Sequence, residues 1–126
     1  MTEPTLRVEN LRTHFFTRLG VVKAVEDMSF SVGPGKILGL VGESGSGKSM
    51  TGYSIMGLVD PPGRVVAGRI LLRGRDLRTL APGAMRSIRG NRVAMIFQDP
   101  MMALNPVLRV DTQMVEAIRA HADVSR

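Results

Sequence analysis

The chain has 126 residues, enough for one modest domain with a core of its own. Its hydrophobic fraction of 44% and charged fraction of 22% are those of a globular protein and exclude a disordered chain. No apolar run reaches the roughly 18 to 20 residues of a membrane-spanning helix, and we expect no secretory signal. The absence of cysteine excludes disulfides and thiolate metal sites.

The net charge is +6, so nucleotides, nucleic acid and membrane surfaces are candidate anionic partners. Arginines are scattered singly along the chain, and only four Phe and one Tyr are available to stack on bases. We therefore expect no nucleic-acid partner, and we interpret most of the charge as solvated surface.

Alternating apolar and polar residues predict two strands near the N-terminus. The first covers residues 5–11, and the second is the latter half of residues 24–32, with three candidates for its inner face: Met28, Phe30 and Val32. Glycine and proline at residues 33–36 predict a turn. The apolar run "ILGLV" at residues 37–41 predicts a third strand, buried on both faces of a parallel sheet.

Apolar residues at helical spacing predict a helix over residues 48–59, stopped by "DPPG" at 60–63 because proline cannot continue a helix. A strand running into a turn is predicted over residues 67–77. A short helix is predicted over residues 81–90, ended by Gly90.

Residues 92–97, "RVAMIF", predict another buried strand, followed by a loop over residues 98–106. Asp111 could cap a final helix. The apolar residues that would share one face of this helix are Met114, Val115, Ile118 and Ala122.

The run "GESGSGKSM" at residues 42–50 meets the pattern G-x-x-x-x-G-K-[ST]. Its glycines let backbone N–H groups turn toward phosphate oxygens, and the helix that follows adds its positive dipole end. Lys48 would reach the β- and γ-phosphates, and the Ser49 hydroxyl would coordinate Mg²⁺. The expected binding residues are Gly42, Glu43, Ser44, Gly45, Ser46, Gly47, Lys48, Ser49 and Met50. The plainer alternative is an ordinary glycine turn.

The sequence lacks the motifs of two other classes of phosphate-binding protein. A GTPase would need the guanine-reading N-K-x-D, which is absent, and a dinucleotide site would need a third glycine where Met50 stands. The best match for the ligand is therefore a nucleoside triphosphate, ATP.

The stretches "LVGESGSGKSMTGYSIMGLV" and "IRGNRVAMIFQDPMMALNP" together resemble the ATP-binding subunits of ABC transporters, in the oligopeptide, dipeptide and nickel importer branch. The resemblance covers nearly the whole chain, and "PMMALNP" departs only mildly from the branch's "PMTSLNP". It implies an α/β fold, an incomplete P-loop NTPase domain of the ABC type that binds ATP and Mg²⁺. Residues 1–106 would belong to its core and residues 107–126 would begin its helical subdomain.

Two further residues match family positions. Gln98 matches the glutamine loop, whose amide would offer an oxygen to Mg²⁺, position the attacking water and couple the nucleotide to the membrane subunits; a solvated loop glutamine is the plainer alternative. Phe15 matches the aromatic residue that stacks on adenine. Its neighbour Phe16, or plain core packing, remains an alternative. His14 and His121 stand alone without a second ligand at metal spacing, and we expect both to be structural or exposed.

Hydrolysis in the family also needs an L-S-G-G-type signature, an aspartate-glutamate pair after a buried strand and a switch histidine, and the chain matches none of them. Without that glutamate no general base is present. The chain resembles the first part of a longer subunit, which we expect to bind ATP but to be catalytically incomplete. The family's strands flanking residues 37–41 come later in the chain, so we expect unpaired edges there and poor stability of the chain alone.

The function that the resemblance implies is to energise import of peptides or similar solutes. The implied partners are transmembrane permease subunits, a second ATP-binding subunit in a dimer and, indirectly, an extracytoplasmic solute-binding protein. The chain would be peripheral, at the cytoplasmic face of the cell membrane. The alternatives are a non-enzymatic nucleotide-binding remnant or regulatory module, and an unrelated P-loop kinase.

Overall fold

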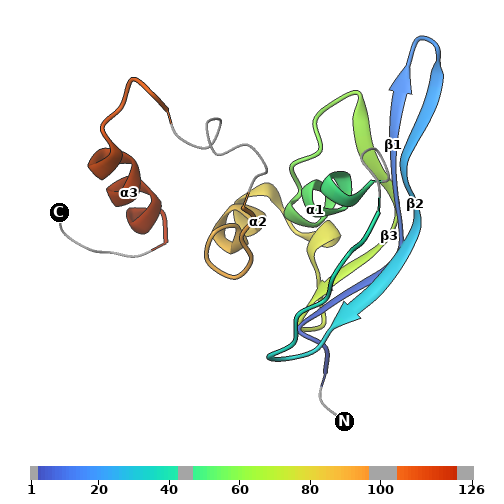
Figure 1. The fold of residues 1–126 in the computed structure, drawn as a ribbon, viewed down its shortest axis with the longest axis horizontal. Coiled ribbons are helices and arrows are strands. Elements are labelled where there is room, and N and C mark those ends of the chain that lie inside the picture. The colour runs from blue at the N-terminus through green and yellow to red at the C-terminus, as the bar shows by residue number, and fades with distance from the viewer. Residues whose placement is uncertain (1–2, 43–46, 97–104, 122–126) are drawn as a thin grey trace. The chain divides into compact units, whose positions relative to one another are not determined.

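The structure, a computed structural model, describes residues 3–42, 47–96 and 105–121. The chain divides into two compact units, Met1–Leu80 and Ala81–Arg126. Figure 1 shows the helices and strands of each unit.

The first unit is an antiparallel sheet with one helix against it. The sheet has the strand order β2-β1-β3-β4, and its members are β1 (Leu6–Thr17), β2 (Gly20–Val32), β3 (Gly63–Leu72) and β4 (Arg75–Asp76). A short 3-10 helix, η1 (Leu77–Thr79), follows β4. The strands predicted over residues 5–11, 24–32 and 67–77 are confirmed and extend further than expected, because β1 and β2 continue into one long hairpin.

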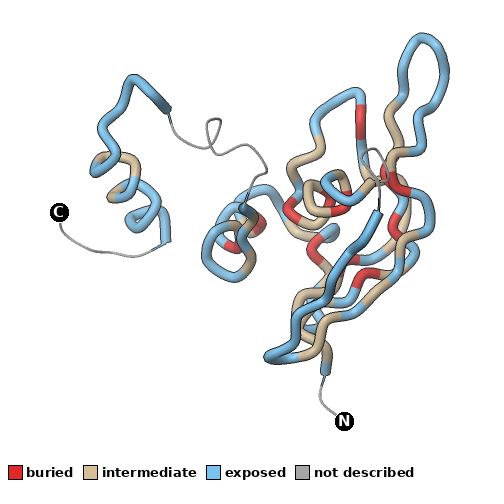
Figure 2. Tube along the Cα trace, viewed as in Figure 1, coloured by how far each residue is buried: buried red, intermediate tan, exposed pale blue. Residues whose placement is uncertain are grey.

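The helix of this unit, α1 (Lys48–Met56), lies against β1, β2 and β3. The buried apolar side chains of the unit form its core between the helix and the sheet (Figure 2): Val8, Leu11, Val25, Met56, Ile70 and Leu77. The inner-face candidates of β2, Met28, Phe30 and Val32, alternate with exposed residues and are partly buried.

The helix predicted over residues 48–59 ends earlier than expected. Gly57 adopts a left-handed conformation with φ of 69° and donates its N–H back to Ser54 O at 3.2 Å, which closes α1 after Met56. The stop signal is therefore this glycine, because only glycine adopts such a conformation at little cost, and the prolines at residues 60–63 follow it.

The prediction of a buried strand over residues 37–41 is wrong for this chain. These residues join no ladder in the part of the chain that the structure describes, and Ile37 and Val41 are 99% and 100% exposed. A strand of a parallel sheet needs hydrogen-bonding neighbours, and the described strands pair among themselves in an antiparallel sheet.

The second unit contains α2 (Pro82–Ile88) and α3 (Val110–Arg119). The helix predicted over residues 81–90 is confirmed, and Gly90 follows its end with φ of 78°. The strand predicted over residues 92–97 is wrong for residues 92–96, where the only pairing is an isolated bridge between Arg89 and Val93 and where Ile96 is 97% exposed; Phe97 lies outside the described residues.

The final predicted helix is confirmed as α3, but Asp111 does not cap it. The N-cap is Arg109, and Asp111 stands in the first turn, where its carboxylate accepts from the N–H of Thr112. On the predicted apolar face Met114 and Ile118 are exposed and Val115 is partly buried, while Ala122 lies outside the described residues.

Across residues 3–42, 47–96 and 105–121, none of the helices combines the length and the hydropathy that a bilayer crossing requires.

Candidate functional site

Both ends of the predicted phosphate loop are described. Gly42 comes before the gap and residues 47–50 after it, whereas the middle of the loop, Glu43, Ser44, Gly45 and Ser46, lies outside the described residues. Gln98 lies outside them as well. The geometry of the candidate site therefore comes from its C-terminal half and from the elements around it.

Gly47 is required at the start of α1 for two reasons. Its φ of 96° lies in the left-handed region, which side chains with a Cβ rarely adopt. A Cβ at this position would also lie 2.5 Å from the carbonyl oxygen of Ala24 in β2. Gly47 thus lies directly against the backbone of β2, at a distance that only a glycine permits.

The N-terminus of α1 is left open and positive. Gly47 provides no side-chain cap, and the first turn contains no acidic residue. The first helical hydrogen bond is the one from Thr51 N to Gly47 O at 2.9 Å, and the Thr51 hydroxyl donates to the same oxygen at 2.7 Å. The amides of the three preceding residues have no partner within the helix, and amides in this position at a helix start are the ones that bind anions.

Lys48 is the first residue of α1, and its side chain reaches back to Gly42. Its ammonium group donates a hydrogen bond to the carbonyl oxygen of Gly42, which bridges the two ends of the glycine run. The next residue, Ser49, is exposed at the same helix start. A cation and a hydroxyl oxygen therefore stand beside the open amides, as phosphate and Mg²⁺ binding require.

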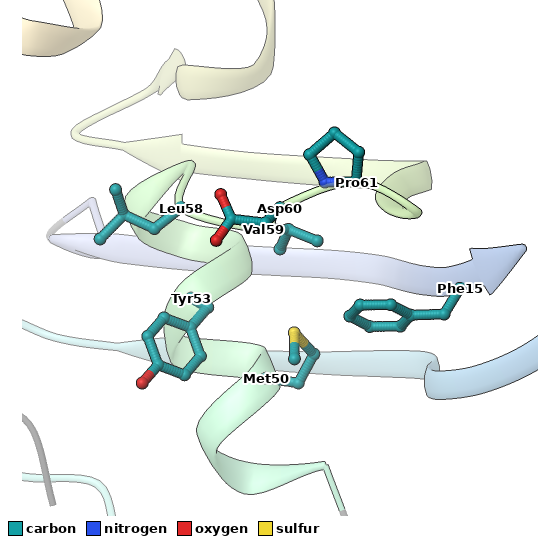
Figure 3. A pocket seen from close by; sticks show the side chains of 7 residues that line it. All are labelled: Phe15, Met50, Tyr53, Leu58, Val59, Asp60 and Pro61. Atoms are coloured by element: carbon teal, nitrogen blue, oxygen red, sulfur yellow. The ribbon is translucent and has the colours of Figure 1, made fainter. Parts of the chain in front are cut away.

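A pocket of about 330 Å³ lies beside this helix start. The residues that line it are Phe15, Met50, Tyr53, Leu58, Val59, Asp60 and Pro61 (Figure 3). Phe15 on β1 and Met50 on α1 lie toward one another in this view. The pocket is thus lined by a residue of the phosphate loop and by an aromatic ring of the neighbouring strand.

The two adjacent phenylalanines lie on opposite faces of β1. The ring of Phe15 lies across Gly63 of β3, where a Cβ would be only 2.4 Å from it. Phe16 is 40% exposed, with the Arg64 guanidinium 4.7 Å above its ring and the His14 ring edge-on at 6.4 Å. Only Phe15 lines the pocket beside α1, because successive side chains of a strand alternate between faces.

His14 is part of an ion-pair cluster on the other face of β1. Its Nε2 lies 2.7 Å from Glu26 Oε2, and the Arg12 guanidinium lies 3.2 Å from Glu26 Oε1. The hydrogen bond from His14 and the charge of Arg12 lower the pKa of Glu26 below its ordinary value. The structural interpretation of His14 is consistent with this cluster.

Several pocket residues had no signal in the sequence. For residues 58–61 the sequence predicts only the end of a helix and a proline stop, yet Leu58, Val59, Asp60 and Pro61 all line the pocket. For Tyr53 it predicts only a place on the apolar face of the helix. A chain segment that crosses a strand distant in sequence has no local pattern that reveals the contact.

Comparisons with known proteins bear on this site. A family model described as ABC transporter matches residues 25–126. A putative peptide import ATP-binding protein of Brucella abortus is 47% identical over 120 residues, which cover 95% of this chain and 36% of that protein.

Two further relatives are dipeptide transport ATP-binding proteins. The one from Escherichia coli is 47% identical over 116 residues, covering 92% of this chain and 36% of its own. The one from Bacillus subtilis is 48% identical over 125 residues, covering 98% and 37%. The chain spans little more than a third of the length of the curated relatives it matches.

The glycine-lysine-serine helix start, the antiparallel strands that precede it and the matched family agree with one another. They confirm the predicted fold class, an incomplete α/β nucleotide-binding domain of the P-loop type. The chain therefore belongs to the ABC transporter family.

Proposed function

We propose that the chain is the N-terminal part of an ATP-binding subunit that energises import of peptides or similar solutes. The observation that carries this proposal is the open, positive N-terminus of α1, with no acidic residue in its first turn and with the Lys48 ammonium beside it. The names of the relatives, peptide import and dipeptide transport ATP-binding proteins, support the solute class.

In this proposal the triphosphate lies against the amides that begin α1. Lys48 exchanges its hydrogen bond with the Gly42 carbonyl for one with a phosphate oxygen, so the loop itself keeps the ammonium group in place until the anion arrives. The adenine lies in the pocket beside Met50, with its face against the Phe15 ring.

The residues that would hold Mg²⁺ are Ser49, through its hydroxyl oxygen, and Gln98, through its amide oxygen. The exposed Ser49 hydroxyl at an uncapped helix start fits such a cation bound to phosphate. When bound, Mg²⁺ neutralises charge on the phosphates. Gln98 would also position the attacking water and couple the nucleotide to the membrane subunits.

Hydrolysis itself needs groups that this sequence does not contain, above all the glutamate that orients water. The proposed partners are transmembrane permease subunits, a second ATP-binding subunit in a dimer and, indirectly, a solute-binding protein. The proposed location is the cytoplasmic face of the membrane. On this basis the 126 residues bind ATP but turn none over.

The second candidate is a nucleotide-binding remnant or regulatory module that is not an enzyme, in which the same helix start and Lys48 would hold the nucleotide. Reading the coding sequence past Arg126 separates the two. An open frame with the signature and the aspartate-glutamate pair supports the transporter subunit, and a stop codon supports the remnant.

The test of the site itself compares two variants in an equilibrium ATP-binding assay. Lys48→Ala should weaken ATP binding by about tenfold or more, because it removes a charge-assisted hydrogen bond to phosphate. Gln98→Ala is the comparison and should leave the affinity within about twofold, because in the proposal its amide contacts Mg²⁺ and the attacking water but not the phosphates, which keep Lys48 and the amides of α1. Equal affinity in the wild type and the Lys48 variant would refute the assignment.

A further inference from the structure

A buried pair of hydroxyl groups joins α1 to β1. Thr13 on β1 is 0% exposed and Ser54 on α1 is 3% exposed, and their hydroxyl oxygens lie 2.6 Å apart. Ser54 donates its own hydrogen to the carbonyl oxygen of Met50 at 2.7 Å. A hydroxyl has one hydrogen, so Thr13 is the donor to Ser54, and the bonds run from the strand through Ser54 to the backbone of Met50.

The hydrogen bond between Thr13 and Ser54 lies on the same face of β1 as the pocket residue Phe15. Thr13 and Phe15 are two residues apart in a regular part of the β1–β3 ladder, where Thr13 pairs with Val65 and Phe15 with Gly63. Both side chains therefore lie on the face that α1 covers.

The spacing of Ser54 and Met50 along α1 is similar to the spacing of Thr13 and Phe15 along β1. Ser54 and Met50 are four residues apart on α1, about one turn, which advances roughly 6 Å along the helix axis. Two residues of a strand advance by about 6.7 Å. A bond between Thr13 and Ser54 thus places Phe15 beside Met50, and these two residues line the same pocket.

We propose that Thr13 and Ser54 are positioning residues that set the distance between the ring that holds the base and the helix start that holds the phosphates. This inference rests on the proposed function. An apolar contact at the same place would bury similar surface, but it would let the helix slide along the strand, whereas a hydrogen bond between two buried hydroxyls is directional.

The inference makes a prediction that a purely structural role does not. Loss of the bond should weaken ligands that contact both Phe15 and the helix start, and should spare ligands that contact the helix start alone. ATP is a ligand of the first kind, and tripolyphosphate, which has no base, is one of the second. The ratio of the two affinities therefore reports positioning.

The experiment measures binding of Mg²⁺–ATP and Mg²⁺–tripolyphosphate to the protein and its variants. Thr13→Val, which keeps the shape and removes the hydroxyl, should lose about fivefold or more in ATP affinity and less than about twofold in tripolyphosphate affinity. Thr13→Ser keeps the hydroxyl and should retain the ratio of the wild type. Thr17→Val is the matched control on the same strand, because its hydroxyl donates to the Gly20 carbonyl in the hairpin turn, away from the pocket.

The outcomes are distinguishable. An equal loss for both ligands, or no loss for either, overturns the positioning role while ATP binding itself stands. Failure of the wild type to bind either ligand refutes the proposed function instead. If Thr13→Val does not fold, Ser54→Ala removes the same bond from the helix side, and its affinity ratio decides the question in the same way.

Discussion

Replacing Gly47 by alanine tests the close approach of Gly47, at the start of α1, to the backbone of β2. The perturbation is one methyl group at the junction between loop and helix. In the structure this methyl carbon would lie 2.5 Å from the carbonyl oxygen of Ala24 and 3.7 Å from Val25 Cγ2. The first contact is with backbone, so no side-chain rotation relieves it, and the loop or β2 must shift.

Two terms set the magnitude. An L-residue in the left-handed region at φ of 96° is destabilised by about 1–2 kcal/mol relative to glycine. Forcing a methyl group into a well-packed site adds about 1–3 kcal/mol. Together they predict a loss of about 2–5 kcal/mol in the free energy of unfolding, a large share of a small domain's stability.

The assay is chemical denaturation of the protein without nucleotide, with two glycine controls. Gly35 has a φ of 68° but nothing within 4 Å of a Cβ, so Gly35→Ala carries the conformational term alone, about 1 kcal/mol. Gly39 has open space and no positive φ, so Gly39→Ala should change the stability by less than about 0.5 kcal/mol. If Gly47→Ala were no more destabilising than Gly35→Ala, the close approach of Gly47 to β2 would be refuted.

Two further predictions concern the hairpin of β1 and β2. Phe15→Leu should weaken ATP binding by about tenfold, the scale of base stacking on an aromatic ring. The ATP affinity of Phe16→Leu, on the opposite face, should stay within about twofold of the wild type. An equal loss in both variants, measured by competition binding, would contradict the choice of Phe15. The lowered pKa of Glu26 means that its ion pair stabilises the fold above the ordinary carboxyl pKa, and that this stability is lost as pH falls through the lowered value. The difference in unfolding free energy between wild type and Glu26→Gln should therefore be largest near neutral pH and vanish in acid, and a difference constant with pH would show that the interaction is not ionic.

Local features of this protein were determined by the sequence alone. The glycine-lysine-serine run, the helix after it and the alternating strands 5–11 and 24–32 depend on neighbours within a few residues, so pattern and turn chemistry were enough to predict them. The helix of residues 81–90 and its end at Gly90 belong to the same class. Even the error at the end of α1 was local, since Gly57 stands three residues before the predicted stop.

The tertiary structure decided what depends on partners distant in the chain. Residues 37–41 have the composition of a buried strand, but a strand forms only where neighbouring strands supply hydrogen bonds. In the described sheet β1, β2, β3 and β4 pair with one another and not with residues 37–41. The face of β1 that meets α1 separates Phe15 from Phe16, which the sequence could not do. The bond between Thr13 and Ser54 joins residues 41 positions apart, and only packing of the helix on the sheet brings two such ordinary hydroxyls together.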